Sequence, residues 1–213
     1  MGSAVENEFK FTTDREINGE AVVRELVSFL KMNNVDYSMK TKHSVDTYYD
    51  SEDLALFIMD CMVRLKRSSN GKLKLTAKRP ISNGDGMMSR EEIERESDGS
   101  FEDVCAFSSS VFPGIDLSSE PSLTLECNRT SIAYGDGIDL TFDSCIYIFG
   151  EESKKFHEIE LECMSDRTDT GFDSIGIRGF IEEHLGFDSV VQSKYRRGVQ
   201  WARGMHPNVR LDF

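Results

Sequence analysis

The stretch Glu6–Phe11, ENEFKF, places an acid, an acid and a base at every second position near the start of the chain. In a β-strand this spacing puts Glu6, Glu8 and Lys10 on one face, because successive side chains point to opposite sides of the strand. The stretch therefore predicts a strand that presents two carboxylates and one ammonium to the same surface.

The same alternation of charged and apolar residues recurs in later strand-like segments. Arg64 and Lys66 share a face in VRLKR. The other charged faces are Lys72, Lys74, Thr76 and Lys78; Arg90, Glu92 and Glu94; Asp139, Thr141 and Asp143; and Glu158, Glu160 and Glu162. For any one strand, a charged outer face in contact with solvent explains this pattern well.

Two features of the whole set favour a charged interior instead. Some strands carry acids and others bases, whereas an ordinary solvated surface mixes the two signs. Like charges two residues apart repel, so three glutamates in a row gain from a bound cation. Both features are explained if the strands form a barrel whose charged faces line a central cavity and whose apolar faces lie outward beneath helices.

The short strands and their turn signals predict an antiparallel β-barrel or a sandwich with two or three helices packed outside. A helix is expected at residues 19–34 with Asn18 as its N-cap, and another at residues 173–187 that ends at Gly186. The length of 213 residues suits a single domain, 1–213, with a C-terminal helix and tail from about residue 173.

The composition narrows the function classes. A formal net charge of −13 argues against nonspecific nucleic-acid binding, although it allows a small polyanion in a local basic cavity. No apolar run is long enough to span a bilayer and no signal peptide is recognisable, so a cytoplasmic location is expected. The 5 cysteines form no CxxC motif, which predicts buried thiols and no disulfide framework or zinc site.

Acidic and basic walls around one cavity suit a metal-complexed polyphosphate. Carboxylates are ligands for Mg²⁺ or Mn²⁺, and Arg and Lys bind phosphoryl oxygens. Together they are the groups that phosphoryl transfer requires.

In the order and spacing of these motifs, the chain resembles the CYTH domains, also called triphosphate tunnel metalloenzymes. ENEFK matches the ExExK signature of that family, and the later motifs follow in the expected order: TYYDSEDLAL, VRLKR, LTAKRP, SREEIE, ECNRTSI, TFDS, HEIELE and SKYRRG. The last of these resembles the closing strand of the family. Arg79 stands where glycine is usual, and Cys127 stands where a lysine is expected.

The resemblance implies an α+β chain, mainly antiparallel β, with an eight-stranded closed barrel that forms a tunnel. It implies a metal site of Glu6, Glu8, Asp143, Glu158, Glu160 and Glu162. It implies phosphate contacts from Lys10, Arg64, Lys66, Lys74, Lys78, Arg90, Arg129, Lys194 and Arg196. Glu158, Glu160 and Lys10 are the expected catalytic residues, and Glu92 and Glu94 either bind metal or neutralise neighbouring bases.

The implied activity is metal-dependent hydrolysis of a terminal phosphoryl group, with inorganic triphosphate as the first choice of substrate. Thiamine triphosphate, nucleoside triphosphates and RNA 5′-triphosphate ends are alternatives within the same class. Some relatives are class IV-type adenylate cyclases that convert ATP to cyclic AMP. A polyphosphate-binding module without catalysis and a purely structural barrel also remain open, as does a homodimer.

Overall fold

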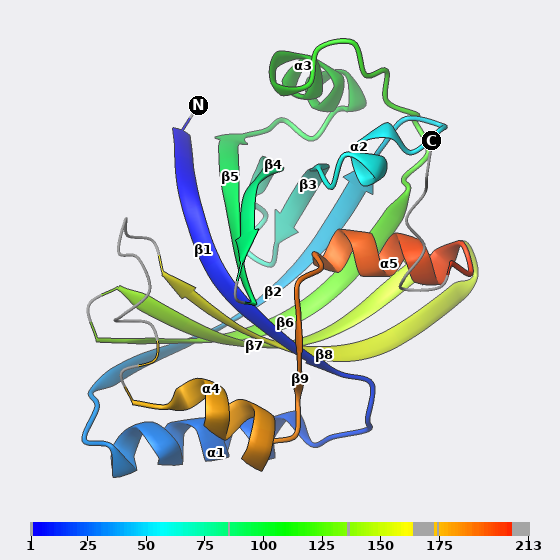
Figure 1. Ribbon diagram of the computed structural model, residues 1–213. Helices are drawn as coiled ribbons and strands as arrows, with labels where there is room; N and C mark the ends of the chain where they lie inside the picture. Colours follow the sequence, from blue (N-terminus) through cyan, green and yellow to red (C-terminus); the bar gives the residue numbers. More distant parts are fainter. Residues whose placement is uncertain (1, 85, 136, 164–172, 174, 206–213) are drawn as a thin grey trace.

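The computed structural model describes residues 2–84, 86–135, 137–163, 173 and 175–205 (Figure 1). Residues 206–213, the end of the expected C-terminal tail, lie outside this part of the chain. Its strands are β1 (Gly2–Thr13), β2 (Tyr37–Tyr49), β3 (Met62–Ser68), β4 (Leu73–Gly84), β5 (Met87–Glu96), β6 (Leu123–Tyr134), β7 (Ile138–Phe149), β8 (Glu152–Cys163) and β9 (Asp188–Val190).

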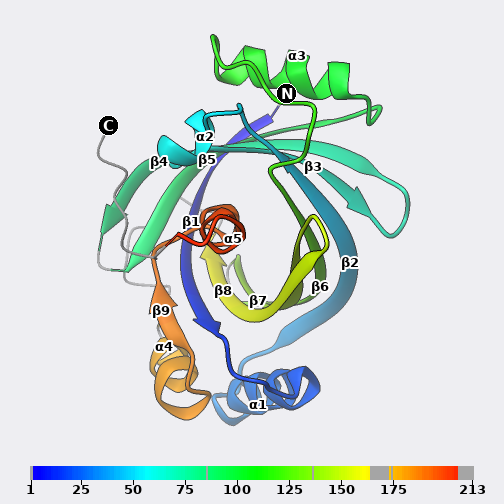
Figure 2. The same cartoon turned by 90° about the vertical axis from the view of Figure 1, so that its right-hand side faces the viewer.

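Eight of the described strands close into an antiparallel barrel, seen along its axis in Figure 2. Their order is β5-β4-β3-β2-β6-β7-β8-β1, and pairing of β1 with β5 completes the ring. The short strand β9 adds to β1 beside Lys10. The predicted mainly antiparallel, eight-stranded closed barrel is confirmed.

Strand β1 closes the barrel and thereby gives the opening stretch its neighbours. Its register pairs Glu6 with Arg90 of β5, and Lys10 with Glu160 of β8. Residues paired across neighbouring antiparallel strands point to the same face, so the acids and bases of distant segments meet inside the barrel.

The outward faces of the strands are covered by helices because they are apolar. Helix α1 (Gly19–Met32) begins at Asn18, whose side chain accepts a hydrogen bond from the Ala21 amide at 3.2 Å, as predicted. Its buried residues pack on outward-facing Phe9 and Phe11 of β1. Helices α2 (Ala55–Ile58) and α3 (Phe101–Val111) contribute to a second apolar cluster, on β3 and β4.

The expected helix at residues 173–187 is shorter than predicted. It consists of α4 (Ile177–Gly179) followed by a π-helical turn, η1 (Phe180–His184). The ring of Phe180 stacks on Phe29 of α1 with 4.4 Å between centroids. These two helical segments therefore cover the same outer part of the barrel as α1.

The segment SKYRRG forms a helix and not the expected closing strand. Helix α5 (Lys194–Ala202) begins at Ser193, whose hydroxyl accepts a hydrogen bond from the Arg196 amide at 3.1 Å. It lies inside the ring of strands (Figure 2), where Tyr195 and Val199 pack against inward-facing apolar residues of β2, β6, β7 and β8. An apolar end of the barrel is thus filled by α5, and the charged positions line the remaining space.

Candidate active site

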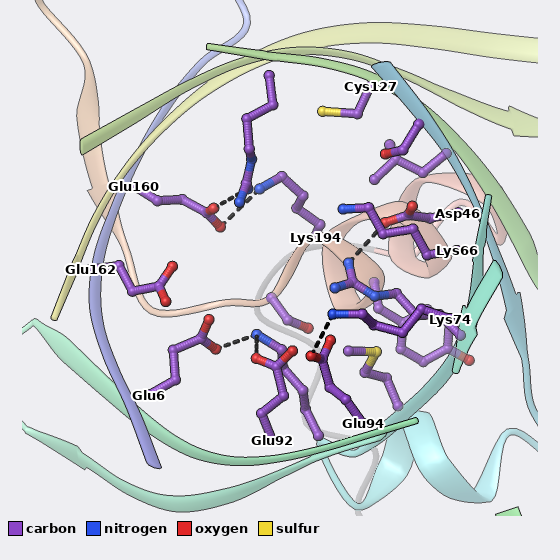
Figure 3. Close-up of a pocket in the computed structure, with 18 of the residues that line it drawn as sticks. Glu6, Asp46, Lys66, Lys74, Glu92, Glu94, Cys127, Glu160, Glu162 and Lys194 are labelled. Atoms are coloured by element: carbon purple, nitrogen blue, oxygen red, sulfur yellow. Dashed lines mark hydrogen bonds and ion pairs between the residues drawn. The ribbon is translucent and has the colours of Figure 1, made fainter. Parts of the chain in front are cut away.

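The charged faces surround a cavity of about 580 Å³ in the barrel interior (Figure 3). It is lined by nearly all of the residues that the sequence places in the site: Glu6, Glu8, Lys10, Arg64, Lys66, Lys74, Lys78, Arg90, Glu92, Glu94, Arg129, Asp143, Glu160, Glu162 and Lys194. Glu158 and Arg196 are the two exceptions. The charged residues of the alternating pattern therefore face the inside of the barrel.

The deepest charges form a compact network around Lys194. Its Nζ atom lies 2.8 Å from Asp143 and 2.8 Å from Glu160, and it also pairs with Glu158. Oxygen atoms of these three acids lie within 4.8 Å of one another. The ammonium group of Lys194 therefore occupies the position where three converging carboxylates could otherwise bind a metal ion.

Lys10 and Arg129 extend this network. Lys10 pairs with Glu8 at 2.8 Å and with Glu160, and Arg129 donates two hydrogen bonds to Asp143 at 2.8 and 2.6 Å. Burial alone would raise the pKa of Glu160, but Lys10, Lys194 and Arg129 hold it well below its usual value. Glu160 is thus a buried, ionised carboxylate at the cavity wall.

Glu158 lies behind this wall and anchors α5. It is fully buried and pairs with Arg197 as well as Lys194. Reading SKYRRG as a strand did not identify Arg197, whereas helical geometry places residues 194 and 197 on one face. The two glutamates that were expected to be catalytic therefore have different positions. Glu160 lies at the cavity, whereas Glu158 holds helix α5.

Two predicted phosphate-binding arginines have partners near α2. Arg196 donates to the carbonyl of Phe57 at 3.2 Å and lies over its ring, away from the cavity. Arg90 lines the cavity, but its guanidinium donates to the Asp60 carboxylate at 2.9 Å. Both arginines hold the α2 segment in this structure.

Glu6, Glu8 and Glu162 form the acidic wall. Glu6 pairs with Lys78 and Glu8 with Lys10, whereas Glu162 has no ion pair within the described part of the chain. Burial, together with Glu6 and Glu160, raises the pKa of Glu162 to about 8. A bound divalent cation would lower the pKa of Glu162 and accept oxygen donors from all three glutamates, which are ligands suited to a hard cation.

The opposite wall is basic. Arg64 pairs with Asp46 at 2.8 Å and Lys74 pairs with Glu94 at 2.8 Å, whereas Lys66 makes no ion pair with any residue that the structure describes. Burial and the neighbouring Arg64 lower the pKa of Lys66 to about 8. Asp46 also faces the cavity, although it was not among the predicted site residues. The sequence gives one indication of this position: in SVDTYYD, Asp46 lies two residues from Ser44 and from Tyr48, so the three share a strand face.

Glu92 and Lys78 complete the rim between the two walls. Lys78 lies 3.0 Å from Glu92 and also pairs with Glu6. Glu92 and Glu94 therefore both neutralise bases in this structure, which is one of the two roles expected for them.

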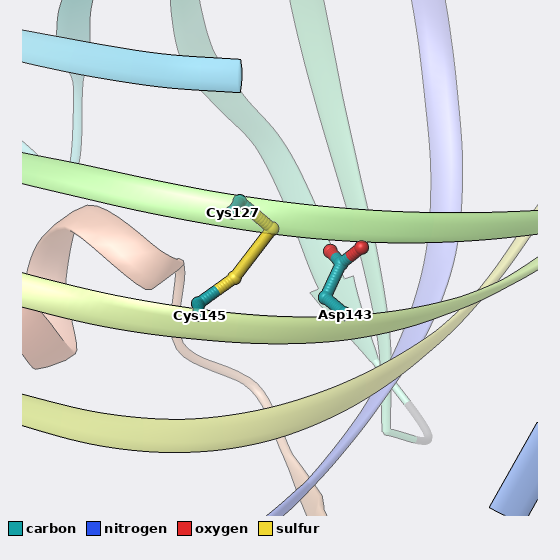
Figure 4. Close-up of side chains that lie close together, drawn as sticks. All are labelled: Cys127, Asp143 and Cys145. Atoms are coloured by element: carbon teal, nitrogen blue, oxygen red, sulfur yellow. A yellow bond between two sulfur atoms is a disulfide. The ribbon is translucent and has the colours of Figure 1, made fainter. Parts of the chain in front are cut away.

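Cys127 lines the cavity and forms a disulfide with Cys145 (Figure 4). This pairing corrects the expectation that the cysteines are separate buried thiols. The two residues lie on β6 and β7, 18 positions apart, and the strand register places them opposite each other. No CxxC spacing could reveal this pair, because barrel pairing and not local sequence brings it together.

Comparisons of the sequence with protein-family models and with curated proteins find no match. Solved structures do resemble the chain. A Hippeastrum protein studied as an adenylyl cyclase and described as having a dominant triphosphatase activity is 15% identical, with a TM-score of 0.59 over 94% of this chain and 97% of that one.

Two microbial structures are similar to the same degree. A protein from Bacillus halodurans, described as an adenylate cyclase candidate, has 16% identity and a TM-score of 0.56 over 92% of this chain and 98% of that one. A Pyrococcus horikoshii protein has 18% identity and a TM-score of 0.56 over 92% of this chain and 99% of that one. These likenesses confirm the barrel fold that the resemblance implied.

The described helices include none that is both long and apolar enough to cross a bilayer.

Proposed function

We propose that this chain hydrolyses the terminal phosphoryl group of a triphosphate, with Mg²⁺ or Mn²⁺ as cofactor and inorganic triphosphate as the preferred substrate. The observation that carries the proposal is that one cavity has both an acidic wall and a basic wall, and that each wall contains a titratable group without an ion-pair partner among the described residues. Among the described residues, Glu162 is a carboxyl group without a basic ion-pair partner on one side, and Lys66 is a base without an acidic ion-pair partner on the other. A metal–polyphosphate complex would give both groups a partner, with the cation beside Glu162 and a phosphate oxygen beside Lys66.

Glu6, Glu8 and Glu162 would hold the cation. When bound, it would supply Lewis-acid polarisation of the phosphoryl oxygens. The network around Lys194 is less suited to a metal, because the Lys194 ammonium already lies among its three carboxylates.

The other lining residues bind and orient the substrate. Lys66, Arg64 and Lys74 offer N–H donors to the phosphate oxygens and offset their charge during transfer. Glu160 is kept ionised by its cationic neighbours, so it can accept a hydrogen bond from the attacking water and align it. Lys10 and Arg129 hold that carboxylate in place.

The described activity of the Hippeastrum protein supports a triphosphatase, and the cyclase descriptions of similar structures support conversion of ATP to cyclic AMP as the second candidate. The two reactions give different products. Hydrolysis releases inorganic phosphate, whereas cyclisation releases pyrophosphate and requires no water.

The test is product analysis with parallel substrates. Purified protein is incubated with inorganic triphosphate, ATP and thiamine triphosphate, each with Mg²⁺, with Mn²⁺ and with chelator. The proposal expects metal-dependent phosphate release that is fastest from inorganic triphosphate. Formation of cyclic AMP and pyrophosphate from ATP would contradict the proposed hydrolase and identify a cyclase. Absence of turnover with all three substrates would overturn the proposal.

A matched pair of variants connects the activity to the cavity. Glu162→Gln removes a carboxylate from the acidic wall and should abolish metal-dependent turnover. Glu91→Gln changes a glutamate on the outer side of β5, where it pairs with Arg79, and should leave turnover unchanged. Equal activity of the two variants would contradict the assignment of the acidic wall.

A further inference from the structure

Cys127 and Cys145 are directly opposed on neighbouring strands, and their Cα atoms are 4.3 Å apart. This spacing is typical of a non-hydrogen-bonded pair in an antiparallel ladder, the type in which side chains approach most closely. The two side chains therefore stay adjacent whether or not their sulfur atoms are bonded. In the reduced protein, the strand register would keep the two thiols in position to form the disulfide again.

The next inward residues along the same strands belong to the ion-pair network that holds Glu160. Arg129 follows Cys127 on β6, and Asp143 precedes Cys145 on β7, each by two positions. Arg129 donates two hydrogen bonds to Asp143, at 2.8 and 2.6 Å, and also pairs with Glu160. A change at the cysteine pair thus acts on the residues that hold Glu160.

The two sulfur atoms differ in access. Cys127 lines the cavity, whereas Cys145 is fully buried. A small reagent in the cavity therefore reaches Cys127 first. Because sulfur atoms that are not bonded must move apart, the Cys127 thiol, which borders the cavity, is the one with space to turn.

We propose that Cys127 and Cys145 form a reversible redox site that tunes triphosphate binding; this inference rests on the proposed function. Hydrogen peroxide accepts two electrons from the pair. The Cys127 thiolate attacks one peroxide oxygen and becomes a sulfenic acid, and the Cys145 thiol then displaces water from it. Two thiols and one peroxide give one disulfide and two waters, and a small dithiol reverses the bond by exchange.

The disulfide form binds triphosphate more tightly. The covalent link holds β6 and β7 together beside Arg129 and Asp143, so the network around Glu160 keeps the arrangement seen here. Reduction releases that constraint and adds a mobile thiol to the cavity wall. The expected change is a roughly fivefold higher KM for triphosphate in the reduced protein.

The experiment compares the whole protein after peroxide and after dithiothreitol. Alkylation followed by peptide mass analysis reports the 127–145 bond without reference to turnover. KM for inorganic triphosphate and calorimetric binding of the same compound report its effect. Cys127→Ser and Cys145→Ser should both show the weaker, reduced-state affinity under either treatment, whereas Cys105→Ser on α3 should respond as the parent does.

The readouts separate the two proposals. Absence of turnover would overturn the proposed function, while bond formation and triphosphate affinity would still test the redox site. Independent alkylation of residues 127 and 145 after peroxide would overturn the redox site. Equal triphosphate affinity of the oxidised and reduced proteins would also overturn it, even with full turnover.

Discussion

At the scale of single residues, Lys66 should make the KM for triphosphate depend on pH. Its pKa is lowered to about 8, and a bound phosphate anion favours the protonated form. KM for triphosphate should therefore be lowest below pH 8 and rise as the pH increases beyond it. A KM that stays constant from pH 7 to 9 would contradict the proposal that Lys66 binds phosphate from the basic wall.

Replacing Lys66 by methionine tests the same residue at fixed pH. The loss of a charged hydrogen bond should raise KM by about tenfold and abolish the rise above pH 8. The control is Lys154→Met, which changes an exposed lysine that pairs with Asp14. Steady-state kinetics of both variants across the pH range provide the measurement.

Glu158 and Glu160 should separate stability from catalysis. Glu158→Gln removes the buried carboxylate that pairs with the partly buried Arg197 and with Lys194, so unfolding in urea should show a loss of about 3–5 kcal/mol. Glu160→Gln should lower kcat with a smaller loss of stability, because Lys10 retains Glu8 and Arg129 retains Asp143. The reverse order of the two stabilities would contradict the assignment of Glu158 to the anchoring of α5.

At the scale of elements, α5 fits inside the barrel because residue 198 is glycine. A Cβ atom there would lie 2.8 Å from the ring of Tyr147 and would also overlap Leu123. Gly198→Ala should therefore destabilise the protein by about 1–3 kcal/mol through overpacking. Its unfolding midpoint and triphosphate affinity would both be measured, since α5 carries Lys194 into the cavity.

Gly179 provides the matched control on another helical segment. No atom lies within 4 Å of a Cβ built there, and its φ of −59° suits any residue. Gly179→Ala should be neutral or stabilising, because alanine lowers the entropy of the unfolded chain. Equal losses of stability in the two variants would show that α5 is not tightly packed in the barrel.

At the scale of the whole molecule, the fold should not depend on the metal. The barrel is closed by strand pairing, and its buried acids largely have basic partners. Chelation should abolish turnover while the far-ultraviolet circular dichroism spectrum stays unchanged. Unfolding on chelation would make the cation structural.

Cation binding should still stabilise the native state through linkage. With Mg²⁺ at one hundred times its Kd, the gain is about 2.7 kcal/mol, and Tm should rise accordingly. Glu162→Gln should reduce this rise, because the variant removes a proposed cation ligand that has no basic ion-pair partner among the described residues. The same rise in Tm for variant and parent would place the cation elsewhere.

The sequence by itself determined which face of each strand is charged and that these faces meet in a barrel. It also located α1, its Asn18 cap and most of the charged residues that line the cavity. These features could be predicted because they depend on local periodicity, which is two residues in a strand and 3.6 in a helix. Periodicity identifies a face without needing to know its neighbours.

Only the tertiary structure decided which charges meet. The register at barrel closure pairs Lys10 with Glu160 and brings Cys127 opposite Cys145. Packing inside the ring makes SKYRRG a helix, which places Lys194 among three acids and gives Glu158 an anchoring position. These arrangements depend on contacts between distant segments, and a local pattern carries no information about which distant segment will be its partner.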